Sequence, residues 1–210
     1  MEKNSKKKVI ELIDKLNKTY PEATCSLDFN TPFELVAAVM LSAQCTDERV
    51  NKTTPSLFKK FPTPESFENA SLEEIEDIIH PCGFYKNKAK NLKQCAYQIV
   101  HEFGGEVPKT MEELTKLAGI GRKSANVILL EVYNIANGIA VDTHAKRLSN
   151  RLGLSSSNTP EKIEQDLLKI IPKEYLKDVN HLLVYHGRAI CTARNPKCEK
   201  CPVSNLCKFF

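Results

Sequence analysis

Leu117-Ala-Gly-Ile-Gly-Arg-Lys-Ser-Ala-Asn126 is the segment of this 210-residue chain that says most about its fold. Helical patterns before and after it, with two glycines between them, predict a tight hairpin joining two helices. Gly119 and Gly121 let the backbone turn with positive φ and come close to a ligand. The second helix begins there with unpaired amides and a positive dipole end, which suits a phosphate. The alternative is a plain turn in which a glycine ends the first helix.

Lys123 falls in the first turn of that second helix, beside Arg122. A free lysine has a pKa near ~10.4, so a nucleophilic amine needs burial, a neighbouring cation or a helix N-terminus to lose its proton. The sequence predicts the last two of these. Lys123 is therefore a candidate nucleophile, and the alternative is a surface lysine at a helix start.

The motif Val141-Asp-Thr-His144 precedes a further predicted helix. Asp142 is either the N-cap of that helix or a carboxylate that activates a nucleophile or stabilises a cationic sugar. His144 is predicted to be a structural, hydrogen-bonding residue.

Four of the eight cysteines gather near the end of the sequence, at Cys191, Cys198, Cys201 and Cys207. Such a thiolate quartet predicts a metal site that holds a loop of little apolar content in shape. The spacing alone leaves zinc and an iron–sulfur cluster both open. Disulfides are disfavoured because the lysine-rich stretch Met1–Lys8 does not resemble a secretion signal.

The remaining cysteines, Cys25, Cys45, Cys82 and Cys95, sit singly among apolar neighbours. We expect them to be buried free thiols.

Composition indicates a folded protein, with 41% hydrophobic residues and a net charge of +4 from 30 basic and 26 acidic residues. No apolar run approaches the ~20 residues of a membrane span, so we expect a cytoplasmic protein without a membrane segment. The basic residues are uneven, and one group comprises Lys86, Lys88, Lys90 and Lys93. This charge map permits a face that binds a polyanion without requiring one. We expect a monomer, since no oligomerisation helix is evident.

Helix signals recur throughout, and alternating strand patterns are missing. Thr31–Glu34, Ser71–Glu74 and Thr110–Glu113 each place a hydroxyl at an N-cap and a glutamate three residues later, which predicts capping boxes. The fold class is therefore all-α. Further helices are predicted over residues 7–18, 46–61, 87–103, 122–135, 143–152, 160–171 and 174–191.

Taken together in this order, the hairpin, the Val-Asp-Thr-His motif and the cysteine quartet resemble the endonuclease III family. Leu41-Ser-Ala-Gln-Cys-Thr-Asp47 and Gly83-Phe-Tyr-Lys-Asn-Lys-Ala89 extend the resemblance over nearly the whole chain. It implies a [4Fe-4S] cluster on the four cysteines and two helical domains with a DNA groove between them. A helix-hairpin-helix, six-helix domain is expected over residues 25–136, and an iron–sulfur cluster domain over residues 1–24 and 137–210.

The resemblance also implies a bifunctional DNA glycosylase and abasic-site lyase of base excision repair. Its partner is double-stranded DNA with an oxidised pyrimidine or an abasic site, which implies association with the nucleoid. Lys123 is expected to attack the sugar C1′ of a flipped nucleotide, form a Schiff base and cut on the 3′ side by β-elimination, with Asp142 assisting. Gln44 and Phe84 occupy the gap-filling and wedge positions. A helix-end amide and a core aromatic remain the alternatives for these two residues.

The other expected DNA contacts are to phosphates. Gly119, Gly121 and Arg122 belong to the hairpin, and Arg194 and Lys197 lie on the loop between the first two clustered cysteines. The cluster is expected to have a structural and DNA-positioning role, the latter through this loop.

Two residues depart from the family pattern. Ala118 replaces a proline before the first hairpin glycine, and Cys45 stands where alanine is frequent. Two other functions are weighed. One is a monofunctional mismatch glycosylase of the same fold, which Lys123 argues against because those relatives lack it; the other is a non-catalytic iron–sulfur DNA-binding module.

Overall fold

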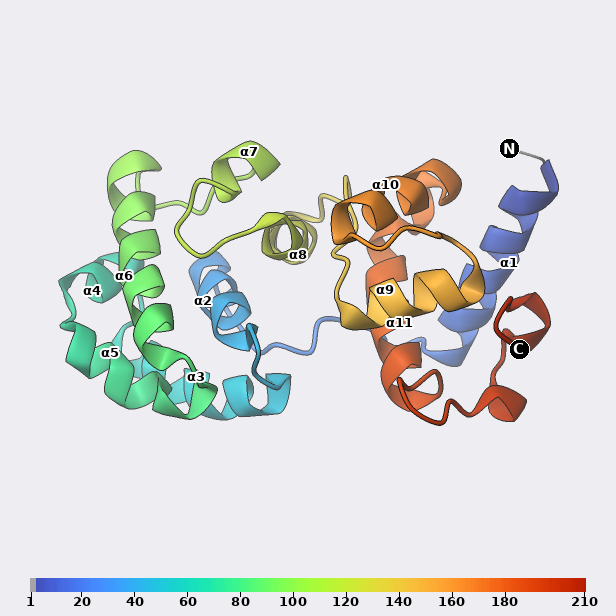
Figure 1. The fold of residues 1–210 in the computed structure, drawn as a ribbon. Helices are drawn as coiled ribbons and strands as arrows, with labels where there is room; N and C mark the ends of the chain where they lie inside the picture. Colours follow the sequence, from blue (N-terminus) through green and yellow to red (C-terminus); the bar gives the residue numbers. More distant parts are fainter. Residues whose placement is uncertain (1–2) are drawn as a thin grey trace. The chain divides into compact units, whose positions relative to one another are not determined.

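The computed structural model describes residues 3–210, and this described part is all-α, as predicted (Figure 1). It contains eleven α-helices and four short 3₁₀ helices. The chain divides into two compact units. Unit 2 is formed by residues 25–133, and unit 1 by residues 134–210 together with the described residues up to Thr24. The sequence analysis expected the domain boundary after residue 136, and in the structure the two units divide after Tyr133. None of the described helices is long and apolar enough to cross a membrane.

Unit 2 carries seven α-helices rather than the expected six, because a single turn, α7, precedes the hairpin. Its helices are α2 (Pro32–Ser42), α3 (Asp47–Lys60), α4 (Pro64–Asn69), α5 (Leu72–Ile79), α6 (Tyr85–Glu102), α7 (Met111–Leu114) and α8 (Arg122–Tyr133), with the 3₁₀ helix η1 (His80–Cys82) between α5 and α6.

Helix α2 forms the centre of unit 2 and packs against α3, α6 and α8 (Figure 1). Its run of buried residues from Phe33 to Leu41 explains this position, since a helix that is apolar on all sides must be enclosed. Phe67 of α4 lies edge-on to Phe33, with ring centroids 5.1 Å apart, and is fully buried. The core therefore fixes α2, the helix that leads directly to Gln44.

Two of the unit 2 helices begin with complete capping boxes. Ser71 accepts from the Glu74 N–H and Glu74 accepts from the Ser71 N–H, as predicted. Thr63 and Ser66 form a second box at α4, which the sequence analysis missed because serine stands in place of the usual glutamate.

The other two predicted boxes are wrong in their second half. Thr31 and Thr110 do cap α2 and α7. However, the carboxylate of Glu34 accepts from the N–H of Asn30 at 2.6 Å, and that of Glu113 accepts from the hydroxyl of Thr110 at 2.7 Å. In both cases the glutamate satisfies a different donor from the one that the pattern predicts.

Unit 1 packs four α-helices around one apolar core. They are α1 (Lys3–Thr19), α9 (Thr143–Leu152), α10 (Pro160–Ile170) and α11 (Leu176–Ala189). Leu16, Leu148, Leu167 and Leu183, one from each helix, are completely buried in a shared cluster. The start predicted for the last helix is too early, because a 3₁₀ turn, η2 (Lys173–Tyr175), precedes α11. Two further 3₁₀ turns, η3 (Cys198–Lys200) and η4 (Ser204–Leu206), follow α11.

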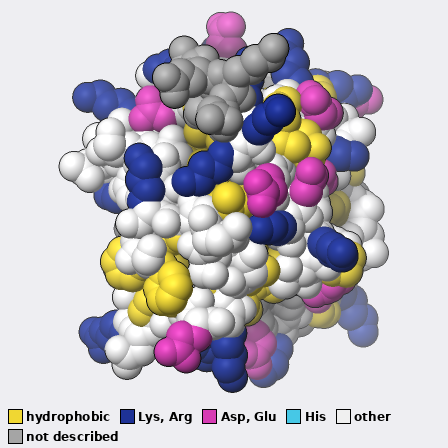
Figure 2. Space-filling model, turned by 90° about the vertical axis from the view of Figure 1, so that its right-hand side faces the viewer, with side chains coloured by type: hydrophobic (Ala, Val, Ile, Leu, Met, Phe, Trp, Pro, Cys, Tyr) yellow, Lys and Arg dark blue, Asp and Glu magenta, His cyan; other side chains and the backbone are white. Residues whose placement is uncertain are grey.

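Figure 2 shows the side of the molecule where α1 lies. Among the described residues on that face, Lys and Arg side chains are interspersed with Asp and Glu and form no single patch. This face does not have the concentrated positive charge that a polyanion would favour.

Candidate active site and iron–sulfur centre

The hairpin between α7 and α8 turns at Gly119, whose φ is +78°. A Cβ there would lie 2.8 Å from Cε of Met40 and 3.1 Å from Cβ of Asn91. The turn therefore needs glycine twice over, for its left-handed backbone and for its close packing on α2 and α6.

The positive φ expected at Gly121 is wrong, because Gly121 is not among the residues with a left-handed backbone. A Cβ at Gly121 would meet nothing within 4 Å, so the backbone here faces open space. The N–H of Ala125 donates to the carbonyl of Gly121 at 2.9 Å, which begins α8. Gly121 therefore leaves the start of the helix accessible rather than shaping the turn.

Gln98 of α6 clamps the hairpin, a contact that sequence reasoning missed. Its Nε2 donates to the carbonyl of Lys116 at 3.1 Å, and its Oε1 accepts from the N–H of Ala118 at 2.8 Å. A proline at position 118 would have no N–H to donate. The Ala118 departure thus gains a hydrogen bond that a proline would lack. No local motif marks Gln98, since its partners are distant in sequence.

Lys123 is exposed and lies in the first turn of α8, next to exposed Arg122. The structure therefore places it at the helix start, two residues after Gly121.

Asp142 is the N-cap of α9, and its Oδ1 accepts from the N–H of Ala145 at 2.7 Å. The capping interpretation is correct, and it also fixes the orientation of the half-buried carboxylate. Two residues on, Nδ1 of His144 lies 3.1 Å from Nη2 of Arg147. Burial lowers the pKa of His144, with Asp142 opposing this shift and Arg147 adding to it. His144 thus has the structural, hydrogen-bonding part predicted for it.

Gln44 and Phe84 share an unusual backbone, with φ values of 54° and 49°. Both side chains are exposed, and that of Phe84 is 67% accessible. The core-aromatic alternative for Phe84 is therefore wrong. Left-handed conformations are uncommon for residues other than glycine, and Asn134 and Asn195 are the other examples among the described residues.

The four clustered cysteines lie in unit 1 after α11, and all are half-buried. Burial raises the pKa of the Cys201 thiol, and negative charge on Cys191, Cys207 and Cys198 raises it further. The four sulfurs are therefore close enough to influence one another. Among the described residues, no group of three or more His, Cys, Asp or Glu is arranged to hold a single metal ion.

Hydrogen-bond donors surround these sulfurs. Nη1 of Arg151 donates to Sγ of Cys191, and the N–H of Phe209 donates to Sγ of Cys207, both at 3.4 Å. Nε2 of His186 lies 3.4 Å from Sγ of Cys201. Donors aimed at sulfur stabilise thiolates, the form in which cysteine binds iron, so these residues fit an iron–sulfur group.

Arg194 and Lys197 are exposed on the loop from Cys191 to Cys198. The loop is ordered by its own hydrogen bonds, because the hydroxyl of Thr192 donates to the carbonyl of Arg194 at 2.7 Å.

Comparison with known proteins agrees with this arrangement. The family model described as "HhH-GPD superfamily base excision DNA repair protein" matches residues 37–173. The model of the "Iron-sulfur binding domain of endonuclease III" matches residues 191–207. The chain is 49% identical to the endonuclease III of Synechocystis, over 97% of this chain and 93% of that protein. It is 38% identical to that of Escherichia coli, over 98% and 97% of the two chains. The chain belongs to the endonuclease III family.

Solved structures of endonuclease III are similar in fold. One, described as "Structure of a non-covalent Endonuclease III-DNA Complex", superposes with a TM-score of 0.92 at 41% identity, covering 97% of this chain and 95% of that one. The sequence-based predictions of a base excision repair DNA glycosylase and of an iron–sulfur cluster are thus confirmed at the level of the family.

Two lysines of the basic group at residues 86–93 point inward. The sequence analysis had included them in a possible polyanion-binding face. Lys88 is buried, and Lys93 donates to the carbonyls of Glu68 and Ala70, the latter at 2.6 Å. Both hold loops within unit 2 and leave the surface charge lower than the sequence suggests.

The lone cysteines of the chain are only partly as predicted. Cys82 and Cys95 are buried, and burial raises the pKa of Cys95 to about 12. Cys25 and Cys45 are half-buried instead, because both lie in loops at the edge of unit 2.

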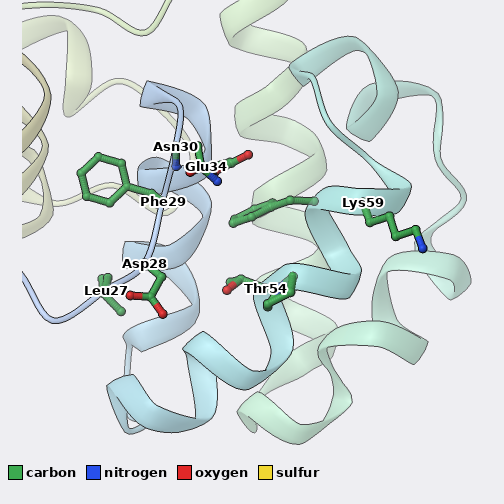
Figure 3. Close-up of a pocket in the computed structure, with 9 residues that line it drawn as sticks. Leu27, Asp28, Phe29, Asn30, Glu34, Thr54 and Lys59 are labelled. Carbon is green, nitrogen blue, oxygen red and sulfur yellow. Dashed lines mark hydrogen bonds between the residues drawn. The ribbon is translucent and has the colours of Figure 1, made fainter.

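Unit 2 contains a cavity of about 610 Å³ that is lined by none of the predicted site residues (Figure 3). Leu27, Asp28, Asn30, Glu34 and Thr54 line it, and Lys59 points away from them. It includes neither Lys123 nor any residue expected to contact DNA.

Proposed function

We propose that this chain is a bifunctional DNA glycosylase and abasic-site lyase that removes oxidised pyrimidines from duplex DNA. The observation that carries the proposal is Lys123, an exposed amine in the first turn of α8 beside the open backbone of Gly121. An amine can displace the base at the sugar C1′ and remain attached as an iminium, whereas an activated water would stop at base removal.

The family supports a covalent step. One similar solved structure, 41% identical, is described as a "Trapped Endonuclease III-DNA Covalent Intermediate". In this chain the iminium of Lys123 acidifies the neighbouring sugar carbon, so β-elimination breaks the 3′ C–O bond. Asp142, oriented by the N–H of Ala145, is the proposed assisting carboxylate.

The damaged nucleotide must leave the base stack before it can react. Phe84 and Gln44 are exposed on left-handed turns, and we assign them to the wedge and the gap left behind. The helix start at Gly121 and Arg122 is proposed to bind a backbone phosphate.

The cluster proposed for Cys191, Cys198, Cys201 and Cys207 is [4Fe-4S]. When bound, it supplies a covalent scaffold for a segment with few buried apolar side chains. Arg194 and Lys197 on the enclosed loop would then contact phosphates. We propose that the chain acts as a monomer in the cytoplasm, on chromosomal DNA.

Borohydride trapping tests the proposal, with a duplex that contains one oxidised pyrimidine or one abasic site. The wild-type protein should become covalently linked to the DNA, and Lys123→Gln should give no adduct and at least ~10³-fold slower strand cleavage while still binding. Lys116→Gln is the matched control, because Lys116 is also exposed and precedes the same hairpin. It should be trapped like the wild type.

The rival functions give different results in the same assay. A monofunctional glycosylase would release the base without an adduct, and a non-catalytic module would do neither. An adduct that persists in Lys123→Gln would show that another amine is the nucleophile.

A further inference from the structure

The two side chains assigned to enter the duplex come from separate loops of unit 2. Gln44 lies between α2 and α3, and Phe84 lies between η1 and α6. Both adopt left-handed backbones and are exposed, so neither is positioned by core packing of its own side chain. If both are to act at one nucleotide, another part of the chain must set the spacing of the two loops.

Lys88, in the first turn of α6, links these loops. Its Nζ donates to the carbonyl of Leu41 at 2.8 Å and to the carbonyl of Cys82 at 2.7 Å. Leu41 is in the last turn of α2, just before Gln44, and Cys82 ends η1, just before Phe84. A single ammonium group therefore bridges the ends of two helices whose carbonyls have no partner within their own helix.

The main chain of Lys88 adds a third tie. Its N–H donates to the carbonyl of Phe84 at 3.2 Å, and the N–H of Asn87 donates to the same oxygen at 3.1 Å. The left-handed residue is thereby fixed from the helix that follows it. The backbone and side chain of Lys88 are thus bonded to the segments that lead to Gln44 and to Phe84.

Burying Lys88 has a cost that its partners must offset. Only 7% of the residue is accessible, and burial lowers the pKa of its ammonium group. Negative charge on the sulfurs of Cys45 and Cys82 opposes this shift in the pKa of Lys88. An apolar residue would fill this space without the cost of burying a charge. The advantage of lysine here is that its ammonium group makes hydrogen bonds to both loops.

We propose that Lys88 is a positioning residue that sets the spacing between the Gln44 loop and the Phe84 loop, so that both side chains reach the same nucleotide. This inference rests on the proposed function, because it assumes that the two side chains enter the duplex.

Lys93 offers a matched control on the same helix. It also donates to two main-chain carbonyls, those of Glu68 and Ala70, but these lie at the end of α4 and not on either loop. Lys93→Met removes the same number of hydrogen bonds as Lys88→Met and should destabilise the fold without affecting the wedge.

The first experiment needs no DNA and uses the protein purified with its cluster. Hydrogen exchange should rise in residues 42–46 and 82–86 together in Lys88→Met, and remain as in the wild type at the 117–123 hairpin. Lys93→Met should leave both loops unchanged. Because this readout is independent of enzymatic activity, it tests the bridge even if the proposed function fails. Unchanged exchange in either loop would overturn the inference.

The second experiment measures affinity for a duplex with a tetrahydrofuran abasic-site analogue and for the undamaged duplex. Lys88→Met should lose about 10-fold in affinity for the analogue and less than twofold for undamaged DNA, and Lys88→Arg, which keeps the donors, should recover part of the loss. Combined with Phe84→Ala, Lys88→Met should add little further loss, because both changes disable the same wedge.

Additive losses, or an equal loss for both duplexes, would show that Lys88 acts only on stability and would contradict the proposal. Should Lys88→Met fail to fold, the same two comparisons apply to Lys88→Arg, which should show a smaller and likewise non-additive loss. An additive loss in Lys88→Arg would also refute it. Failure of the wild type itself to prefer the analogue would instead count against the proposed function.

Discussion

The hairpin of unit 2 (residues 117–123) and the segment that contains the four clustered cysteines of unit 1 (residues 191–207, here the cysteine loop) are stabilised by different interactions. Gly119 packs directly on Met40 and Asn91, and Gln98 makes two hydrogen bonds to the backbone that leads into the hairpin, at Lys116 and Ala118. In the cysteine loop only Val203 and Leu206 are buried apolar residues. The remaining ties are hydrogen bonds, several of them to sulfur. The hairpin is therefore stabilised by its own packing, whereas the loop has few such contacts and is expected to depend on the cluster proposed for its thiols.

The largest effect on this comparison is expected from Cys207→Ser. Losing one of four thiolate ligands should remove the cluster iron and raise hydrogen exchange throughout residues 191–207, with no change in the 117–123 hairpin. Iron content and exchange mass spectrometry measure both. Cys95→Ala is the control, since Cys95 is buried in unit 2 and should leave the iron in place. A cysteine loop that stays protected after iron loss would show that packing suffices there too.

A smaller effect is expected in the hairpin from Gly119→Ala. The added Cβ meets Met40 and Asn91 in a left-handed backbone, so the free energy of unfolding should fall by roughly 2–3 kcal/mol. Gly121→Ala should change it by less than about 1 kcal/mol, because that Cβ meets open space. Urea unfolding of the two variants, with iron intact in both, measures the difference. Equal losses would mean that packing does not determine the turn.

The smallest effect should come from the surface of the cysteine loop. Removing both charges of Arg194 and Lys197 by alanine substitution should weaken duplex binding a few-fold and reduce the salt slope of log K by about 1.8, if each contacts one phosphate. Stability and iron content should not change, since both side chains are exposed. The charge-matched control replaces Lys162 and Lys169 of α10 and should leave the slope as in the wild type. An unchanged slope in the first variant would remove this loop from the DNA-contacting surface.

Local signals in the sequence predicted most of the helices well. The Asp142 cap and the glycine at position 153 bound α9 at the predicted residues Thr143–Leu152, and Ser71 and Glu74 form the predicted box. Such signals act between neighbours in the sequence, so they can be read without a structure. Where a side chain had a choice of partners, as Glu34 did, the pattern predicted the cap but not the bond.

Residues whose partners lie far away in the sequence could not be predicted in this way. Gln98 reaches the hairpin from α6, and Arg147 of α9 reaches the carbonyls of Gly187 and Cys191. No motif records these contacts because each depends on how two helices pack. The exposed Phe84 is a related case, since its sequence alone suits a core position equally well.

The chemical groups of this protein could be read from its sequence: an amine at a helix start, a capping carboxylate and a thiol quartet. These are identities and short spacings, which covalent geometry passes on directly to local structure. Which side chains are buried and which are exposed depends on how the helices pack. Lys88 is buried between two loops while Lys123 is exposed, although both are lysines in the first turn of a helix. The difference arises because burial depends on what other parts of the chain pack against each helix start.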